Sequence, residues 1–157
     1  MTASDRDLGR EAREALKAFS DRYGDVFEDF DPAAVEVEVL EAPHRPGALP
    51  PGRQAVVAFY WPERARYLYV SYAGPNSNAR YQSQHYTPRG SPSNLAKRIL
   101  AHREQLGLGQ LDELSVGPWM RRKLSRVNFL FPARWGREVG KVFKEYLKRR
   151  WMPELGG

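Results

Sequence analysis

Residues 55–73, AVVAFYWPERARYLYVSYA, decide the fold of this protein. Two segments rich in β-branched and aromatic residues, 55–61 and 67–73, flank the sequence PERAR, whose proline favours a turn. We therefore predict a β-hairpin with one strand on each side of Pro62. The rest of the chain supplies elements before and after this hairpin.

Two elements and a loop precede the hairpin. Apolar residues recur at helical spacing within 4–23, which predicts an amphipathic helix. Residues 34–41, AVEVEVLE, alternate valine with glutamate and predict a half-buried strand. The segment 42–54 is rich in proline and glycine and predicts a loop. We place a boundary at this loop, between an acidic helix–strand extension at 1–42 and a core domain at 43–157.

A long polar segment, 74–94, follows the hairpin with the sequence GPNSNARYQSQHYTPRGSPSN. Its amide, hydroxyl, imidazole and guanidinium groups are suited to hydrogen-bonding bases and phosphates. A loop of this length is uncommon unless it is functional or disordered. We expect nucleic-acid contacts from this segment and from basic residues after it: Arg80, Tyr81, Gln84, His85, Arg89, Lys97, Arg121, Arg122 and Lys123.

Residues 94–102, NLAKRILAH, form the centre of a helix that we predict to begin at Ser91-Pro92 and to end at Gly107. At helical spacing, His102 falls within the apolar stripe and Arg98 falls on its edge. Periodicity by itself favours a packed histidine and an arginine that extends past the core to solvent. The spacing of these two residues alone does not define a site.

The C-terminal part of the chain predicts a short helix with a loop at 110–122, a strand at 125–131 and a helix at 137–150. In the last helix Glu145 lies beside the apolar face, where an exposed ion pair with Arg149 is its simplest role. Taken together, the elements predict an α+β fold. Its three-stranded antiparallel sheet is flanked by helices, and the N-terminal helix and strand are added to it.

The net charge of +6 is unevenly distributed along the chain. Residues 1–42 carry 5 Lys/Arg and 12 Asp/Glu, a net of −7; residues 43–88 carry 5 and 1, a net of +4. Residues 89–157 carry 15 and 6, a net of +9, with aromatic residues interleaved. A basic C-terminal half suits a polyanion, most simply nucleic acid, and an ordinary solvated basic surface is the alternative.

Several classes of site and location are excluded or disfavoured by the sequence. The chain contains no cysteine, which excludes disulfides and thiolate sites, and its three histidines lack the spacing of metal ligands. It has neither a phosphate-binding Walker loop nor a nucleophile elbow. No apolar run approaches the roughly 18 residues of a membrane span, and the N-terminus lacks an apolar signal segment. We expect a soluble cytoplasmic protein without a membrane partner.

In order and spacing, these elements resemble the GIY-YIG nuclease domain over residues 50–157. AVVAFYW stands at the first motif, LYVSYAG at the second, NLAKRILAH at the arginine helix, and VFKEYLKRRWMPELG at the final helix with its glutamate and proline. The long segment after the second motif is similar to the restriction-endonuclease branch of the family. The resemblance implies a metal-dependent endonuclease of a restriction or defence type that hydrolyses phosphodiester bonds of DNA, with duplex DNA as the expected substrate.

The same resemblance implies a catalytic cluster of Tyr69, Arg98, His102 and Glu145. Glu145 would hold Mg²⁺ or Mn²⁺, hard cations that take oxygen ligands and retain waters. Arg98 would bind two oxygens of the scissile phosphate through its planar guanidinium. Tyr69 would orient or deprotonate the attacking water, and His102 is an alternative base because its free pKa lies near neutrality. If the site is of this kind, Tyr69, Arg98 and Glu145 converge on one concave surface.

Several positions depart from the family pattern, and three of them define an alternative. Val57 stands at the tyrosine of the first motif, Ser71 at the glycine of the second, and Gly156 at the terminal asparagine. Loss of a catalytic group lowers a rate by orders of magnitude without abolishing binding. The alternative is therefore a nucleic-acid-binding module on the same fold that has lost cleavage, and a third reading is an unrelated α+β protein. The acidic extension would pack against the core, mediate a homodimer or shield the basic face.

Overall fold

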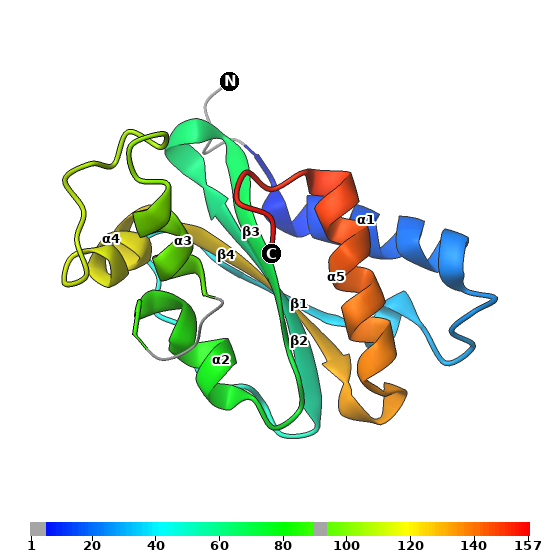
Figure 1. The fold of residues 1–157 in the computed structure, drawn as a ribbon. Helices are drawn as coiled ribbons and strands as arrows, with labels where there is room; N and C mark the ends of the chain where they lie inside the picture. The colour runs from blue at the N-terminus through cyan, green and yellow to red at the C-terminus, as the bar shows by residue number, and fades with distance from the viewer. Residues whose placement is uncertain (1–5, 90–93) are drawn as a thin grey trace.

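The structure, a computed structural model, describes residues 6–89 and 94–157. Its centre is an antiparallel sheet of four strands in the order β1-β4-β2-β3 (Figure 1). The predicted α+β class is confirmed. The strands are β1 (Glu36–Leu40), β2 (Arg53–Trp61), β3 (Arg66–Ala73) and β4 (Ser125–Pro132).

Helices cover both faces of the sheet (Figure 1). On one face, α1 and α5 bury an apolar cluster that contains Phe19 and Phe143. On the other face, α2, α3 and α4 bury a second cluster that contains Phe59 and Ile99. In the described part of the chain these helices are α1 (Leu8–Tyr23), α2 (Asn78–Gln82), α3 (Leu95–Ala101), α4 (Val116–Lys123) and α5 (Arg137–Trp151).

The predicted hairpin is confirmed as β2 and β3, which pair antiparallel with Val57 opposite Ser71. Side chains alternate between the two faces, so Val57 packs in the cluster beneath α3 and Tyr60 in the cluster beneath α1. The strand predicted at 125–131 is β4, which pairs with the other side of β2. Strand β2 of the hairpin is therefore a central strand of the sheet, with β3 on one side and β4 on the other.

The prediction of a three-stranded sheet is wrong, because β1 adds a fourth strand. It pairs antiparallel with β4, with Val37 opposite Phe129. Without β1, the backbone groups along the outer side of β4 would lack partners. The predicted extension at 1–42 thus adds β1 to the sheet and α1 to the core that residues 43–157 form. The ring centroid of Phe19 in α1 lies 5.1 Å from that of Phe143.

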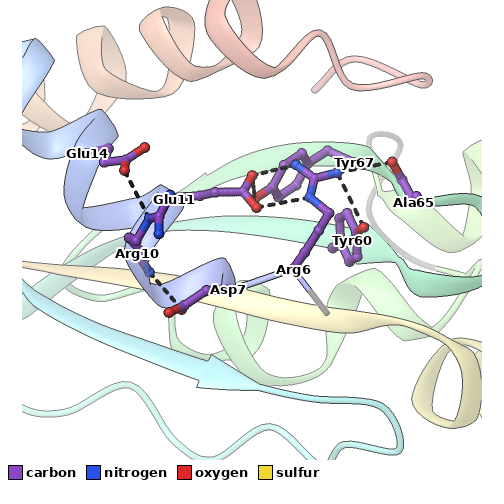
Figure 2. A network of polar contacts seen from close by, with 8 residues as sticks. All are labelled: Arg6, Asp7, Arg10, Glu11, Glu14, Tyr60, Ala65 and Tyr67. Atoms are coloured by element: carbon purple, nitrogen blue, oxygen red, sulfur yellow. Dashed lines mark hydrogen bonds and ion pairs between the residues drawn. The ribbon is translucent and has the colours of Figure 1, made fainter. Parts of the chain in front are cut away.

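A polar network ties the start of α1 to the turn between β2 and β3 (Figure 2). Arg6 forms an ion pair with Glu11 and donates hydrogen bonds to the Ala65 carbonyl, at 3.1 Å, and to the Tyr60 hydroxyl, at 3.3 Å. The hydrogen bond to Glu11 raises the pKa of the Arg6 guanidinium above its usual value. The basic side chain at the start of the acidic helix is therefore part of the fold.

The polar segment 74–94 is only partly an open loop. It contains α2 and a 3₁₀ turn at Gln84–Tyr86. The helix start predicted at Ser91-Pro92 lies outside the described residues. The observed cap of α3 is Asn94, whose side-chain oxygen accepts a hydrogen bond of 2.9 Å from the backbone N–H of Lys97.

Helix α3 ends at Ala101, about a turn and a half before the predicted end at Gly107. His102 caps it, and residues 102–107 continue in turns. The helices predicted at 110–122 and 137–150 are α4 and α5. Within residues 6–89 and 94–157, none of the helices combines the length and the apolar character needed to cross a membrane.

Candidate functional site

Tyr69 and Arg98 of the predicted cluster lie in contact. Tyr69 is fully buried in β3, and the Arg98 guanidinium of α3 lies 5.6 Å from its ring centroid. Arg98 Nη1 also donates a hydrogen bond of 2.8 Å to the Leu155 carbonyl. Among the described residues, the Tyr69 hydroxyl has no hydrogen-bond partner. A buried hydroxyl without a partner costs about 1–3 kcal/mol, and because Tyr69 has no exposed surface, a bound ligand does not contact this hydroxyl directly.

Glu145 is not brought to this pair by any contact within the described residues. Its side chain is 62% exposed on α5, and its carboxylate lies 3.5 Å from the ammonium of Lys148 rather than pairing with Arg149 as predicted. Helices α5 and α3 lie on opposite faces of the sheet (Figure 1). The structure thus places Glu145 at the solvent side of α5, apart from Tyr69 and Arg98.

His102 lies at the surface, outside the apolar stripe predicted for it. It is exposed at the end of α3, and its Nδ1 lies 3.0 Å from the Arg98 carbonyl oxygen. The reason is that α3 ends at Ala101, so His102 caps the helix and does not occupy a helical position on its apolar stripe. The imidazole therefore shares a helix end with Arg98 but does not enter the core.

The surroundings of Glu145 do not fit Mg²⁺ or Mn²⁺. In the described part of the chain, no three histidine, aspartate or glutamate side chains gather in a way that could hold a metal ion. Glu145 pairs with Lys148 and borders a hollow that also contains Arg22, Arg149 and Arg150. Hard divalent cations need oxygen ligands, and these neighbouring cations would repel them.

Lys144, the residue before Glu145, faces the edge of β3. Successive residues of a helix are turned by about 100°, so the two side chains point in different directions. A Cβ atom on Gly157, which lies beside β3, would be 3.4 Å from Cε of Lys144. Burial lowers the pKa of the Lys144 ammonium, and the charges of Lys148, Arg80 and Arg98 lower it further against the opposing effect of Glu145. Lys144 is thus a half-buried cation crowded by like charges.

Other cations of α5 continue along the same side of the helix. Arg137, Lys141, Lys144 and Lys148 are spaced by four, three and four residues, which places them in one row. At the end of this row, the Arg137 guanidinium packs against Gly74, just after β3. We call the row, together with the two arginines that reach the same edge from the other face, the β3-edge strip: Arg80, Arg98, Arg137, Lys141, Lys144 and Lys148.

The C-terminal tail fixes the edge on which this strip lies. The backbone N–H of Leu155 donates a 2.8 Å hydrogen bond to the Leu68 carbonyl, and the Val70 N–H donates one of 2.9 Å to the Gly156 carbonyl. The tail therefore runs beside β3 (Figure 1) and satisfies part of its outer backbone. Because the Leu155 carbonyl also accepts from Arg98, the same tail orients the arginine of the strip.

Two of the predicted nucleic-acid contacts, Tyr81 and His85, lie in the core with 2% of their surface exposed. The Tyr81 carbonyl accepts a 2.6 Å hydrogen bond from buried Arg126. The His85 Nε2 lies 2.8 Å from the Ser71 hydroxyl. The structure gives both side chains packing roles, and neither is within reach of a nucleic acid.

The remaining predicted contacts lie at or near the surface. Arg80 belongs to the strip and donates a 3.1 Å hydrogen bond to the Tyr72 carbonyl. Arg121 lies over the Tyr86 ring at 4.9 Å from its centroid, and Lys123 is ion-paired with Glu63 at 2.8 Å. The others are exposed or half-buried: Gln84, Arg89, Lys97 and Arg122.

The sequence-based prediction missed the cations of α5. Their spacing was a usable signal, because a row of four basic residues at helical intervals marks one side of a helix. A functional role for Glu145 in this helix does not take account of that spacing. Comparisons with protein-family models, with curated proteins and with solved structures found no match. The functional interpretation therefore rests on geometry, and the GIY-YIG resemblance stays a prediction.

The buried imidazole of His85 should make folding depend on pH. Its Nδ1 accepts a 3.3 Å hydrogen bond from the Leu95 N–H, so the ring is neutral with its proton on Nε2. Burial, with smaller effects of Arg80, Arg126 and Lys144, lowers its pKa to about 3. Below about pH 6.5 the unfolded chain binds a proton that the folded chain rejects, so stability falls with pH by about 1.4 kcal/mol per unit until about pH 3.

Urea unfolding across this pH range measures the effect. We expect the His85→Asn variant to lose this part of the pH dependence, whereas His102→Asn, at an exposed histidine, should retain it. His44 is a second buried histidine whose pKa burial lowers, and it contributes equally to both variants. Identical slopes for the wild type and His85→Asn would show that His85 is protonated in the folded state.

Proposed function

We propose that this protein binds nucleic acid, with duplex DNA as the expected partner, through the β3-edge strip. One observation carries the proposal: Lys144 of α5 and Arg98 of α3 both reach the C-terminal tail beside β3, at Gly157 and at the Leu155 carbonyl. Glu145 is instead exposed and paired with Lys148. The strip therefore offers a row of cations, which suits phosphates. This is the second of the two nucleic-acid hypotheses drawn from the sequence, a binding module rather than a metal-dependent hydrolase.

The length and charge of the strip support a phosphate-backbone contact. Its α5 row covers twelve residues from Arg137 to Lys148, a rise of about 16 Å, which is close to the axial length of about five base pairs. Burial and, after it, the neighbouring like charges lower the pKa of the Lys144 ammonium, and an anion would relieve the repulsion between these charges. Binding of phosphates would also release counterions from DNA, which favours association at low salt.

The Tyr69–Arg98 contact supports an anchoring point for one phosphate within the strip. A guanidinium binds two phosphate oxygens through its planar donors. The buried Tyr69 ring, 5.6 Å from the Arg98 guanidinium, and the Leu155 carbonyl hold that guanidinium in place at the edge of β3. The same contact favours a second candidate function, the metal-dependent endonuclease implied by the resemblance. That candidate needs a carboxylate site, and the surroundings of Glu145 do not fit one.

Replacing Glu145 by glutamine separates the two candidates. We expect plasmid retention on a gel to be strengthened about twofold, because the change removes a negative charge and frees Lys148 from an exposed ion pair worth about 0.5 kcal/mol. Retention should be the same with Mg²⁺, with Mn²⁺ and with EDTA. The endonuclease hypothesis predicts instead that Glu145→Gln abolishes a metal-dependent cleavage.

The matched control is Glu14→Gln on α1. Glu14 also forms an exposed ion pair within one helix turn, with Arg10 at 3.2 Å, and it lies away from the strip. The Glu14→Gln variant should leave plasmid retention on the gel unchanged. Metal-dependent nicking of the plasmid by the wild type that disappears in Glu145→Gln, but not in Glu14→Gln, would overturn the binding proposal and restore the endonuclease.

A further inference from the structure

A second basic surface, beside the strip, adds aromatic rings to its cations. It is a hollow of about 430 Å³ between the end of α1 and the C-terminal half of α5. The β3-edge strip does not use it, and it lies on the side of α5 that faces α1. We call it the α1–α5 hollow; its lining residues are Arg22, Tyr23, Glu145, Tyr146, Arg149 and Arg150.

The aromatic walls of the hollow are held from behind by Phe19. The Phe19 ring centroid lies 4.8 Å from that of Tyr23 and 5.4 Å from that of Tyr146. The two tyrosine rings are nearly perpendicular, with centroids 6.2 Å apart. Both are only partly buried, so each ring keeps a part of its surface towards the hollow. Rings fixed in this way can stack on a flat ligand with little loss of side-chain entropy.

The charges of the hollow favour an anion. The Arg22 guanidinium lies 5.6 Å from the Tyr23 ring centroid, and Arg150 donates a 3.3 Å hydrogen bond to the Tyr146 hydroxyl. Across residues 6–89 and 94–157, no carboxylate lies within 4.0 Å of the guanidinium of Arg22, Arg149 or Arg150. The one carboxylate of the lining, Glu145, is paired with Lys148.

A flat ring next to a phosphate is the ligand that matches both features. Bases stack on aromatic side chains, and phosphates bind guanidinium groups. The volume lies within the range of small-ligand pockets and accommodates one nucleotide. A base inside a duplex cannot reach such walls because it is already stacked, so the nucleotide must be unpaired.

The hollow and the strip adjoin along α5. Lys148 belongs to the strip, and its ion-pair partner Glu145 lines the hollow. We infer that the α1–α5 hollow binds one unpaired nucleotide, so that the protein prefers a duplex with a single-stranded overhang to a blunt duplex. This inference rests on the proposed binding of the duplex by the strip. A free mononucleotide carries the same ring and phosphate, and the test distinguishes the two sources.

The experiment compares the affinity of the full chain for a blunt duplex and for the same duplex with a three-nucleotide overhang that carries 2-aminopurine. We expect about tenfold tighter binding of the overhang duplex, towards the lower end of what one base–aromatic stack contributes, together with quenching of the 2-aminopurine fluorescence. Free deoxyadenosine monophosphate is the third probe. If it quenches or competes at equal concentration, the hollow is a mononucleotide site and the overhang preference is wrong.

The variant Arg22→Ala/Arg149→Ala changes two exposed side chains of the hollow and leaves Phe19 and the two rings in place. It should lose the overhang preference and the quenching and keep most of the affinity for the blunt duplex. The control Arg10→Ala/Lys17→Ala removes the same charge from the exposed side of α1 and should keep the preference. An overhang preference that is absent in the wild type, or that survives in the hollow variant, overturns the inference while blunt-duplex binding stands. Loss of blunt-duplex binding itself would instead contradict the proposed function.

Discussion

Replacing Lys141 and Lys144 with glutamate is expected to lower the affinity for duplex DNA about 100-fold at physiological salt. Both residues belong to the β3-edge strip, and each contact between an ammonium and a phosphate contributes about 1.5 kcal/mol. Lys144→Glu also places a carboxylate among cations that now repel one another, so the fold should tolerate it. Fluorescence anisotropy with a labelled blunt duplex measures the change.

The salt dependence of this affinity gives an independent measure. If each of the six cations of the strip meets one phosphate, the logarithm of the binding constant should fall with the logarithm of salt concentration at a slope of about −5. The double variant should have a slope of about −3.5, because two contacts are lost. A variant that binds more weakly with an unchanged slope would have lost affinity for another reason, such as a disturbed fold.

The control for this double variant is Arg10→Glu/Lys17→Glu on α1. It makes the same change in net charge at two exposed positions of α1, the helix that packs against the side of α5 away from the strip. We expect at most a threefold loss of affinity, since charges beyond a Debye length of about 8 Å are largely screened. Equal losses in the two double variants would show that DNA responds to net charge alone, and the strip would then not be the binding surface.

Replacing Arg126 with methionine is expected to destabilise the fold by about 3 kcal/mol. Arg126 is fully buried in β4 and donates hydrogen bonds to the Asn128 side chain, at 2.7 Å, and to the Tyr81 carbonyl, at 2.6 Å. Its guanidinium lies 4.5 Å from the Tyr81 ring centroid. Methionine fills much of the volume but leaves two buried acceptors without donors, each costing about 1–3 kcal/mol. Urea unfolding monitored by circular dichroism measures the loss.

The same substitution at Arg53 serves as the control. Arg53 is half-buried at the start of β2, and it donates to the Ala34 and Leu130 carbonyls at 3.1 and 3.3 Å. Water can replace it there, so Arg53→Met should cost about 1 kcal/mol. If Arg126→Met is as stable as the wild type, the buried guanidinium does not stabilise the packing of α2 on the sheet.

The prediction of a strand at 125–131 does not include the burial of Arg126. Arg126 and Asn128 occupy alternate positions and therefore share one face, and their neighbours Val127 and Phe129 share the other. Two polar residues on one face of a strand usually indicate a solvated face. Here that face is covered by α2 and the turn at Gln84–Tyr86, whose partners come from a distant part of the chain. Local sequence does not record this covering.

The position of Glu145 on its helix depends in the same way on distant segments. The apolar face of α5 was predicted from Val139, Val142, Phe143 and Tyr146, and Glu145 borders that face. In the structure, Phe143 and Leu147 are fully buried residues of α5 that pack on the sheet, whereas Tyr146 packs on Phe19 of α1. Two partners make the apolar face broad, and its centre cannot be placed from the sequence of α5 alone.

Local sequence specifies several features of this protein: the hairpin, the strand at 125–131, the helix at 137–150, and the concentration of positive charge after residue 88. These follow from periodicity and turn chemistry, which act over a few residues. The packing of distant segments decides that β1 joins β4, that His85 and Arg126 are buried, and that Lys144 reaches the tail segment that also binds Arg98. Each of these depends on which distant segment covers a given face, and that choice is made by the packing of the whole core.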